Sequence, residues 1–205
     1  SMKLGLGDGN GTLTFSGDSV NAGGVDAVKD IVPTAYTAVY ENTNTVDNGL
    51  ATTSGRNTTG MFGYANSFGG IDVSLGYNMK NSSTGQGDES SIGLTMADSL
   101  MDGLTLVAGR FDDENVAEND TYGVKYTAGS ITAGYQITKV DYDSTATADQ
   151  DATHYGVSLA VNENLSVSAG RQSVDIDSAV DNEINSGVSA SYTMGSITIG
   201  AALNQ

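Results

Sequence analysis

Carboxylates are the most abundant groups in this chain that could carry chemistry. The 205 residues include 25 Asp and Glu against 8 Lys and Arg, which gives a formal net charge of −17. An acidic excess of this size is suited to attracting cations, divalent ones in particular. It argues against nucleic acid as a partner, because phosphate backbones are bound by clustered lysines and arginines.

Motifs for catalysis or for a fixed metal ion are weak or missing. The single histidine, His154, follows an acidic segment, but no Gly-x-Ser-x-Gly motif supplies the nucleophile of a Ser-His-Asp hydrolase. Asp8-Gly9-Asn10-Gly11 starts like a calcium-binding loop, yet Leu13 stands where that loop needs a glycine. We therefore expect no enzyme, no cofactor and no dedicated metal site. Loose binding of Ca²⁺ or Mg²⁺ by the acidic segments stays open.

The composition indicates that strands and turns, and not helices, carry the acidic side chains. The chain has 27 glycines, one proline, no cysteine and no tryptophan. Its polar residues are mainly Ser, Thr, Asn and Asp, which favour turns and the wet faces of strands over helix interiors. No segment approaches the roughly 20 apolar residues of a transmembrane helix. We therefore expect an all-β fold without disulfides.

A glycine-centred phrase recurs after residue 60, at Gly63, Gly93, Gly123, Gly156 and Gly187. The intervals are 30, 30, 33 and 31 residues, and a tight turn followed by an aliphatic run comes after each glycine. Within these runs apolar and polar residues alternate, so each strand has one apolar and one polar face. The repeating unit is a β-hairpin, and we count about ten such strands after residue 57.

The connections alternate between tight turns, such as Gly69-Gly70, and longer polar segments. The longer segments lie near residues 80–90, 112–121, 141–153 and 174–185. Fifteen of the 25 acidic residues fall in these four segments. Because successive connections of a meander lie at opposite ends of the sheet, we expect the negative charge at one end.

Two architectures are compatible with strands of this kind. A soluble sandwich buries its apolar faces against a second sheet, whereas an outer-membrane barrel turns them to lipid and its polar faces to a watery lumen. Two features favour the barrel. Polar faces built of Gly, Ser, Thr and Ala leave room for water inside it. Short turns at one end of the sheet and longer loops at the other match the two ends of an outer-membrane barrel. The alternative is a soluble or surface-exposed β-rich adhesin or binding domain with acidic, divalent-cation-binding loops.

Three phrases of the sequence resemble the Gram-negative general diffusion porins, particularly those of alphaproteobacteria. They are Tyr-Gly-Val-Lys-Tyr at 122–126, Gly-Ser-Ile-Thr-Ala-Gly-Tyr at 129–135 and Leu-Ser-Val-Ser-Ala-Gly-Arg at 165–171. The resemblance implies a 16-stranded transmembrane β-barrel in the bacterial outer membrane, usually a homotrimer surrounded by lipid and lipopolysaccharide. It implies a channel for the passive diffusion of small hydrophilic solutes and ions.

The resemblance also divides the chain into two parts. Residues 1–57 correspond to the end of a strand, at Lys3–Asp8, and to a long constriction loop, at Gly9–Asn57, that folds into the barrel. Residues 58–205 correspond to hairpins of the barrel wall. The chain then begins near the family's fifth strand and lacks its last one, so the resemblance implies an internal fragment with about 10–11 antiparallel strands.

Charged residues that line the constriction also follow from the resemblance. The family sets acids of the constriction loop against a basic cluster on the facing wall, and Asp18, Asp26 and Asp30 are the acidic candidates here. The field between the two groups orients dipolar solutes. Together with the acidic loops, this arrangement predicts a weak cation preference.

Five residues are candidates for the basic cluster: Arg56, Lys80, Lys125, Arg110 and Arg171. Alternation places Lys80 and Lys125 on the polar face, and Arg56 precedes a strand. Arg110 and Arg171 have the parity of Tyr77 and so belong to the apolar face, unless a bulge at Gly109 or Gly170 redirects them. If they face lipid, we expect them near the headgroups, because arginine at the bilayer midplane costs roughly 2–4 kcal/mol.

Overall fold

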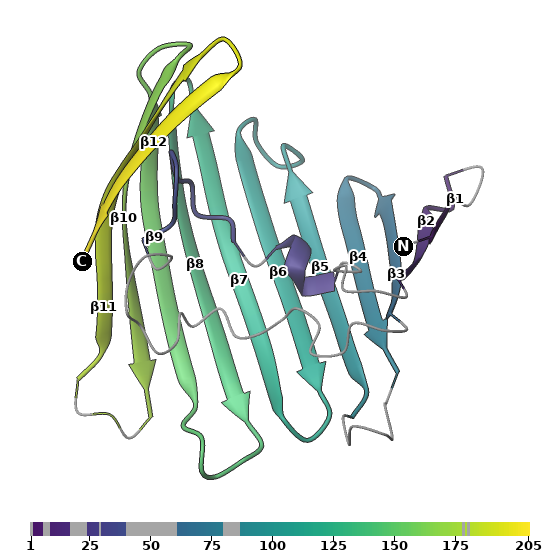
Figure 1. Cartoon of the computed structure of the whole chain (residues 1–205). Coiled ribbons are helices and arrows are strands. Elements are labelled where there is room, and N and C mark those ends of the chain that lie inside the picture. The colour runs from purple at the N-terminus through teal and green to yellow at the C-terminus, as the bar shows by residue number, and fades with distance from the viewer. Residues whose placement is uncertain are drawn as a thin grey trace.

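The computed structural model describes residues 2–5, 9–16, 24–28, 30–39, 61–79, 87–177, 179 and 181–205. They form one antiparallel sheet of 12 strands, in which each strand is hydrogen-bonded to its neighbours in the sequence. The sheet curves into an open trough whose edges in the described chain are β1 and β12 (Figure 1). The predicted all-β meander is confirmed. No helix in the described residues is long and apolar enough to span a membrane.

The strands lengthen from four residues in β1 to 12 in β7, and the last strand, β12, has eight. Their bounds are β1 Met2–Gly5, β2 Thr12–Ser16, β3 Met61–Phe68, β4 Ile71–Asn78, β5 Glu89–Ala97, β6 Leu104–Asp113, β7 Ala117–Ala128, β8 Ile131–Tyr142, β9 Gln150–Ala160, β10 Leu165–Ile176, β11 Glu183–Met194 and β12 Ile197–Asn204. A 3₁₀ turn, η1, covers Gly24–Ala27.

The first part of the chain differs from the prediction in one strand. β2 pairs with both β1 and β3, in registers that include Leu13 opposite Tyr64 and Phe15 opposite Phe62. Gly9–Asn57 is therefore not one continuous loop, and the long connection begins after Ser16. The five residues of β2 alternate correctly, but so short a run cannot be told from a loop by periodicity alone. The ten strands counted after residue 57 are all present.

Several segments predicted as long loops continue the strands instead. β6 and β7 remain paired as far as Asp113 opposite Ala117, so only residues 114–116 connect them. Four acidic residues of 112–121 thus belong to the ladder, namely Asp112, Asp113, Glu118 and Asp120, whereas Glu114 lies in the turn. The apolar–polar alternation fades here because most residues on both faces are polar, but the backbone hydrogen bonds that hold the ladder do not depend on side chains.

Two ends of the sheet can still be distinguished (Figure 1). Tight turns at 69–70, 129–130 and 195–196 mark one end, which we call the turn end. The connections at 79–88, 143–149 and 177–182 mark the other, which we call the loop end. Acidic residues such as Asp113, Asp141 and Asp175 lie in the strand segments next to the loop end.

The two faces of the sheet have opposite character. The outer face exposes large apolar side chains, with Tyr122 at 54%, Val157 at 43% and Leu203 at 74% of their maximum. The inner face carries glycines and buried polar side chains, including Gln136 and Gln172. This polar and small-residue face, and not the apolar one, is the face that residues 24–39 cover (Figure 1).

Candidate functional site

Residues 24–39 cross the inner face from β4 toward β12, and we call the described residues 24–28 and 30–39 the strap (Figure 1). η1 begins the strap and packs against β4, β5 and β6. Farther along, Ala38 reaches Asn204 of β12. The strap therefore spans nearly the whole width of the described wall.

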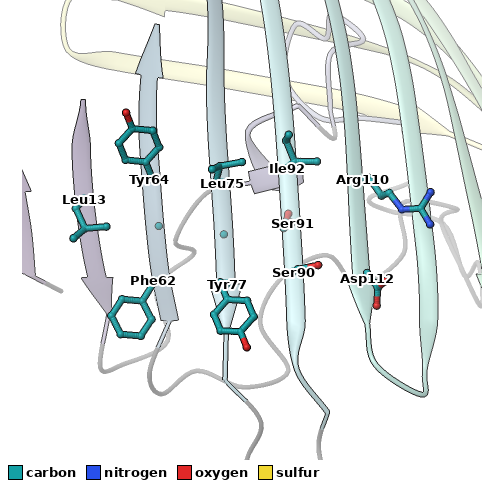
Figure 2. A pocket seen from close by; sticks show the side chains of 12 residues that line it. Leu13, Phe62, Tyr64, Leu75, Tyr77, Ser90, Ser91, Ile92, Arg110 and Asp112 are labelled. Atoms are coloured by element: carbon teal, nitrogen blue, oxygen red, sulfur yellow. The ribbon is translucent and has the colours of Figure 1, made fainter. Parts of the chain in front are cut away.

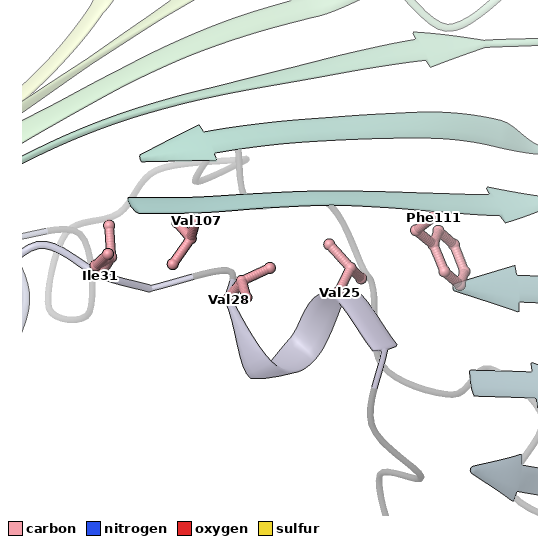
Figure 3. Packing of buried hydrophobic residues seen from close by; sticks show 5 residues of the cluster. All are labelled: Val25, Val28, Ile31, Val107 and Phe111. Carbon is pink, nitrogen blue, oxygen red and sulfur yellow. The ribbon is translucent and has the colours of Figure 1, made fainter. Parts of the chain in front are cut away.

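Apolar side chains of the strap pack onto the wall at its start. Val25, Val28 and Ile31 form one buried cluster with Val107 and Phe111 of β6 (Figure 3). Val25 is completely buried. Burying one such aliphatic side chain stabilises by roughly 1.5–3 kcal/mol, so the cluster anchors the start of the strap to the wall.

Glycines of the wall make room for the strap, and we call them the glycine track: Gly93, Gly109, Gly123, Gly134, Gly156, Gly170 and Gly200. A Cβ atom at Gly109 would lie 2.7 Å from Val28 Cγ2, and one at Gly134 would lie 2.6 Å from Pro33 Cδ. Real carbon atoms do not approach so closely, so the strap could not lie this near the wall if these residues carried side chains. Neighbouring strands align parts of the track, as where Gly134 and Gly170 each pair with Gly156.

Wall side chains satisfy the backbone of the strap, which has no partner strand in the sheet. The hydroxyls of Ser and the amides of Gln and Asn supply these contacts from six strands. Backbone N–H groups donate to wall oxygens at Gly24–Ser74 (2.8 Å), Val25–Ser91 (2.6 Å), Ile31–Gln136 (3.0 Å), Ala35–Ser168 (2.9 Å) and Tyr36–Ser189 (3.2 Å), and Asn204 Nδ2 donates to the Ala38 carbonyl (3.0 Å). Because backbone groups buried without partners are costly, these contacts fix the path of the strap.

Gln136 connects the strap to the wall at the most buried of these contacts. Its Oε1 accepts from Ile31 N and its Nε2 donates to Thr121 Oγ1 at 2.8 Å, while the side chain is 1% exposed. We expect Gln136→Leu to lower the free energy of unfolding by about 1–3 kcal/mol, because Ile31 N–H and Thr121 lose their buried partner. Chemical unfolding of the full-length protein in detergent measures this.

The neighbouring Tyr135 provides a matched control for that substitution. It lies on the outer face of the same strand and is exposed. Tyr135→Leu leaves the contacts of the strap intact, so its unfolding midpoint should stay close to that of the unmodified protein. Equal losses in the two variants would contradict the anchoring role of Gln136.

The predicted acidic candidates are only partly within the described residues. Asp26 lies part-buried in η1 and Asp30 lies exposed on the strap, so both belong to the segment that covers the inner face. Asp18 lies outside the described residues, as do Arg56 and Lys80 among the basic candidates.

Lys125 is a basic residue on the inner face. It lies on β7, opposite Thr105 of β6 and Gly134 of β8, and therefore on the face of the sheet that the strap covers. The described residues therefore bring Asp26, Asp30 and Lys125 to one face of the sheet.

Arg110 and Arg171 lie on the outer face, and their inclusion among the constriction residues is wrong. The ladders run through Gly109 and Gly170 without a bulge, so strict alternation holds on both strands. Arg110 pairs with Glu118 and with Asp120, the latter at 3.4 Å. Arg171 is exposed opposite Tyr155 in the ladder.

Acidic residues that the sequence pattern assigns to loops also reach the inner face. Glu89 and Asp113 are buried opposite one another near the loop end, and Glu89 Oε2 accepts from Asn78 Nδ2 at 3.1 Å. Asp72 lies on the same face farther toward the turn end. Among the described residues no three His, Asp or Glu side chains gather as a metal site would require.

The glycine track is the part of this site that the sequence reading missed. Gly93, Gly123 and Gly156 are members of the 30-residue repeat, which predicts a hairpin but says nothing of a covering segment. The available signal is that each of six successive strands, β5 to β10, carries a glycine on its polar face: Gly93, Gly109, Gly123, Gly134, Gly156 and Gly170. A stripe of glycines across one face of a sheet indicates close approach by another backbone.

A family model described as Gram-negative porin matches residues 3–205. Among solved structures, one porin aligns with a TM-score of 0.69 and 15% identity, over 96% of this chain and 73% of that one. OmpT, an outer membrane protein of Vibrio cholerae, aligns as an in-vitro folded protein with a TM-score of 0.65 and 15% identity, over 96% of this chain and 66% of that one. Its loop L8 deletion mutant aligns with a TM-score of 0.63 and 16% identity, over 95% and 71%.

No curated protein matches the chain. At these low identities the structural likenesses establish the fold alone, whereas the family model covers nearly all of the sequence.

Proposed function

Because this chain belongs to the Gram-negative porin family, we propose that it forms the wall and the constriction of an outer-membrane channel for passive diffusion of small hydrophilic solutes and ions. The observation that carries the proposal is the strap, which is fixed to the inner face while the apolar face points outward. A segment held across the inside of a barrel narrows the lumen, and its charged side chains meet every passing solute.

The exposed apolar face does not favour a soluble adhesin. Monomeric soluble proteins rarely expose large contiguous apolar patches, whereas lipid-facing strands require them. The family and the fold likewise indicate a channel and not an enzyme. We propose that the full-length protein closes as a 16-stranded barrel and assembles as a homotrimer among outer-membrane lipid and lipopolysaccharide.

The charges on the inner side support a weak cation preference. The described residues on that side include the acidic residues Asp26, Asp30, Asp72, Glu89, Asp113 and Glu183 and the basic residue Lys125. An excess of carboxylates in a narrow passage raises the local concentration of cations.

Planar bilayers test the channel and its preference together. The full-length protein should conduct in stepwise increments, and under a KCl gradient its reversal potential should have the sign of K⁺ selectivity. Absence of conductance would exclude the channel, and a potential of the opposite sign would exclude the cation preference alone.

A further inference from the structure

The inner face has a hollow of about 390 Å³ between η1 and strands β3, β4 and β5, and we call it the inner hollow. Its lining includes Ala27 of η1, Ala65 of β3, Asp72 and Ser74 of β4, and Gly93 and Thr95 of β5. Ala27 and Ala65 are exposed, so the hollow is open on the inner side of the sheet. A volume within the roughly 300–1,000 Å³ typical of small-ligand sites has room for one small solute.

The strands under the inner hollow have opposite chemistry on their two sides. Figure 2 shows this part of the wall from the outer side, with Leu75 of β4 and Ile92 of β5 in front and η1 behind the strands. Asp72 and Ser74 have the opposite parity to Leu75 along β4 and therefore point to the side of η1. Thr95 pairs with Asp72 in the ladder, so it lies on the same side. The three polar side chains thus face the inner hollow together.

Asp72, Ser74 and Thr95 bring three oxygen acceptors close together. Thr95 stands directly opposite Asp72, and the Cβ atoms of such a pair are about 4.5–5.5 Å apart. Ser74 is the next residue of β4 on the same face, roughly 7 Å farther along the strand. Hydrogen bonds join heavy atoms about 2.9 Å apart, so one group between the three side chains can donate to all of them.

The carboxylate of Asp72 has no ion-pair partner among the described residues. Its two neighbours in the ladders, Ser67 of β3 and Thr95 of β5, are both neutral. Lys125, a basic residue on the same face, lies three strands away on β7. Because Asp72 is exposed, its charge is available to a cationic solute on the inner side of the sheet.

A primary ammonium group matches this arrangement better than a metal ion does. It has three N–H donors around one charge, and Asp72, Ser74 and Thr95 supply three acceptors. The Ser74 hydroxyl accepts from Gly24 N at 2.8 Å and retains a second lone pair. Calcium takes about six or more oxygen ligands, whereas no three acidic or histidine side chains gather in the described part of the chain.

We propose that the inner hollow binds small hydrophilic solutes that carry a primary ammonium group, with the ammonium held by Asp72, Ser74 and Thr95. The proposal rests on the proposed function, because it names a class of solute for that channel. A solute in the inner hollow lies beside Ala27 at the start of the strap, and therefore beside the constriction. Cations without N–H groups and divalent metal ions are the competing occupants.

Saturation-transfer difference NMR of the full-length protein in detergent tests the inner hollow, with glucosamine as the probe and glucose as its neutral counterpart. Glucosamine should bind about tenfold more tightly than glucose, because only its ammonium forms charged hydrogen bonds. Asp72→Asn should weaken glucosamine binding about tenfold, and Thr95→Val, which loses one neutral acceptor, about threefold. Asp102→Asn is the matched control, since it removes the same charge from an exposed position in the connection between β5 and β6.

Four results would overturn the proposal. They are equal binding of glucosamine and glucose, equal glucosamine binding by the Asp72→Asn and Asp102→Asn variants, displacement of glucosamine by Ca²⁺ at equal concentration, and binding of tetramethylammonium as tight as that of glucosamine. Tetramethylammonium has no N–H group, so the last result would mean that the carboxylate attracts any cation.

Planar bilayers separate this proposal from the proposed function. Glucosamine added at the turn end should lower the single-channel K⁺ conductance of the unmodified protein more than that of the Asp72→Asn variant, because the bound solute lies beside the strap. Equal lowering in both proteins would contradict the site. A protein that binds glucosamine but never conducts would contradict the channel and leave the inner hollow in place.

Discussion

Replacing Gly134 by leucine should raise the single-channel conductance of the full-length protein. Even the first carbon of the new side chain would lie 2.6 Å from Pro33 Cδ and 3.1 Å from Val32 Cα, which is a backbone atom. Overpacking of this kind costs about 1–3 kcal/mol, and the strap can relieve it by leaving the wall. Conductance steps in planar bilayers measure the change, and the unfolding midpoint should fall with it.

Ala133→Leu is the control for this experiment. Ala133 precedes Gly134 on β8 but points to the outer face, where it is exposed. The added leucine there meets lipid and should leave conductance unchanged. If both variants conduct like the unmodified protein, the strap does not depend on the glycine track for its position.

Changing the charge of the strap should produce the second large effect. Asp26→Asn combined with Asp30→Lys changes the charge of the strap by three units in the positive direction. Since charges within a Debye length of about 8 Å act on a passing ion with little screening, the channel should change from cation to anion preference. The sign of the reversal potential under a KCl gradient measures this outcome.

An equal charge change on the outer face separates a local effect from the net charge of the protein. Asp141→Lys combined with Asp175→Asn makes the same change at two exposed positions, on β8 and β10. These side chains do not face the strap, so the cation preference should persist. A similar shift in both double variants would mean that the strap does not control selectivity.

The sheet was predictable from the sequence because its pattern is local. An alternation of period two needs only a few residues to show itself, and ten strands after residue 57 repeat it. The boundaries were less predictable. At residues 112–121 most side chains on both faces are polar, so the apolar–polar alternation stops, while backbone hydrogen bonds keep β6 and β7 paired on either side of the turn.

Of the candidate site, only the acidic residues of the strap could be predicted from the sequence. Asp26 and Asp30 could be assigned to a covering loop by family resemblance, and the strap carries both. Parity assigns Arg110 and Arg171 to the apolar face, and only a bulge at Gly109 or Gly170 would redirect them. The continuous registers exclude a bulge at either position, so both arginines keep the facing that parity gives them.

The sequence by itself determined the hairpins, the two faces, the acidic character and the family, because each depends on neighbouring residues or on short phrases. Only the tertiary structure decided that the recurrent glycines receive the strap. The contacts that place the strap join residues 50 to 166 positions apart, as from Gly24 to Ser74 and from Ala38 to Asn204. A glycine in a strand shows where a backbone can approach, but folding alone selects the segment that does so.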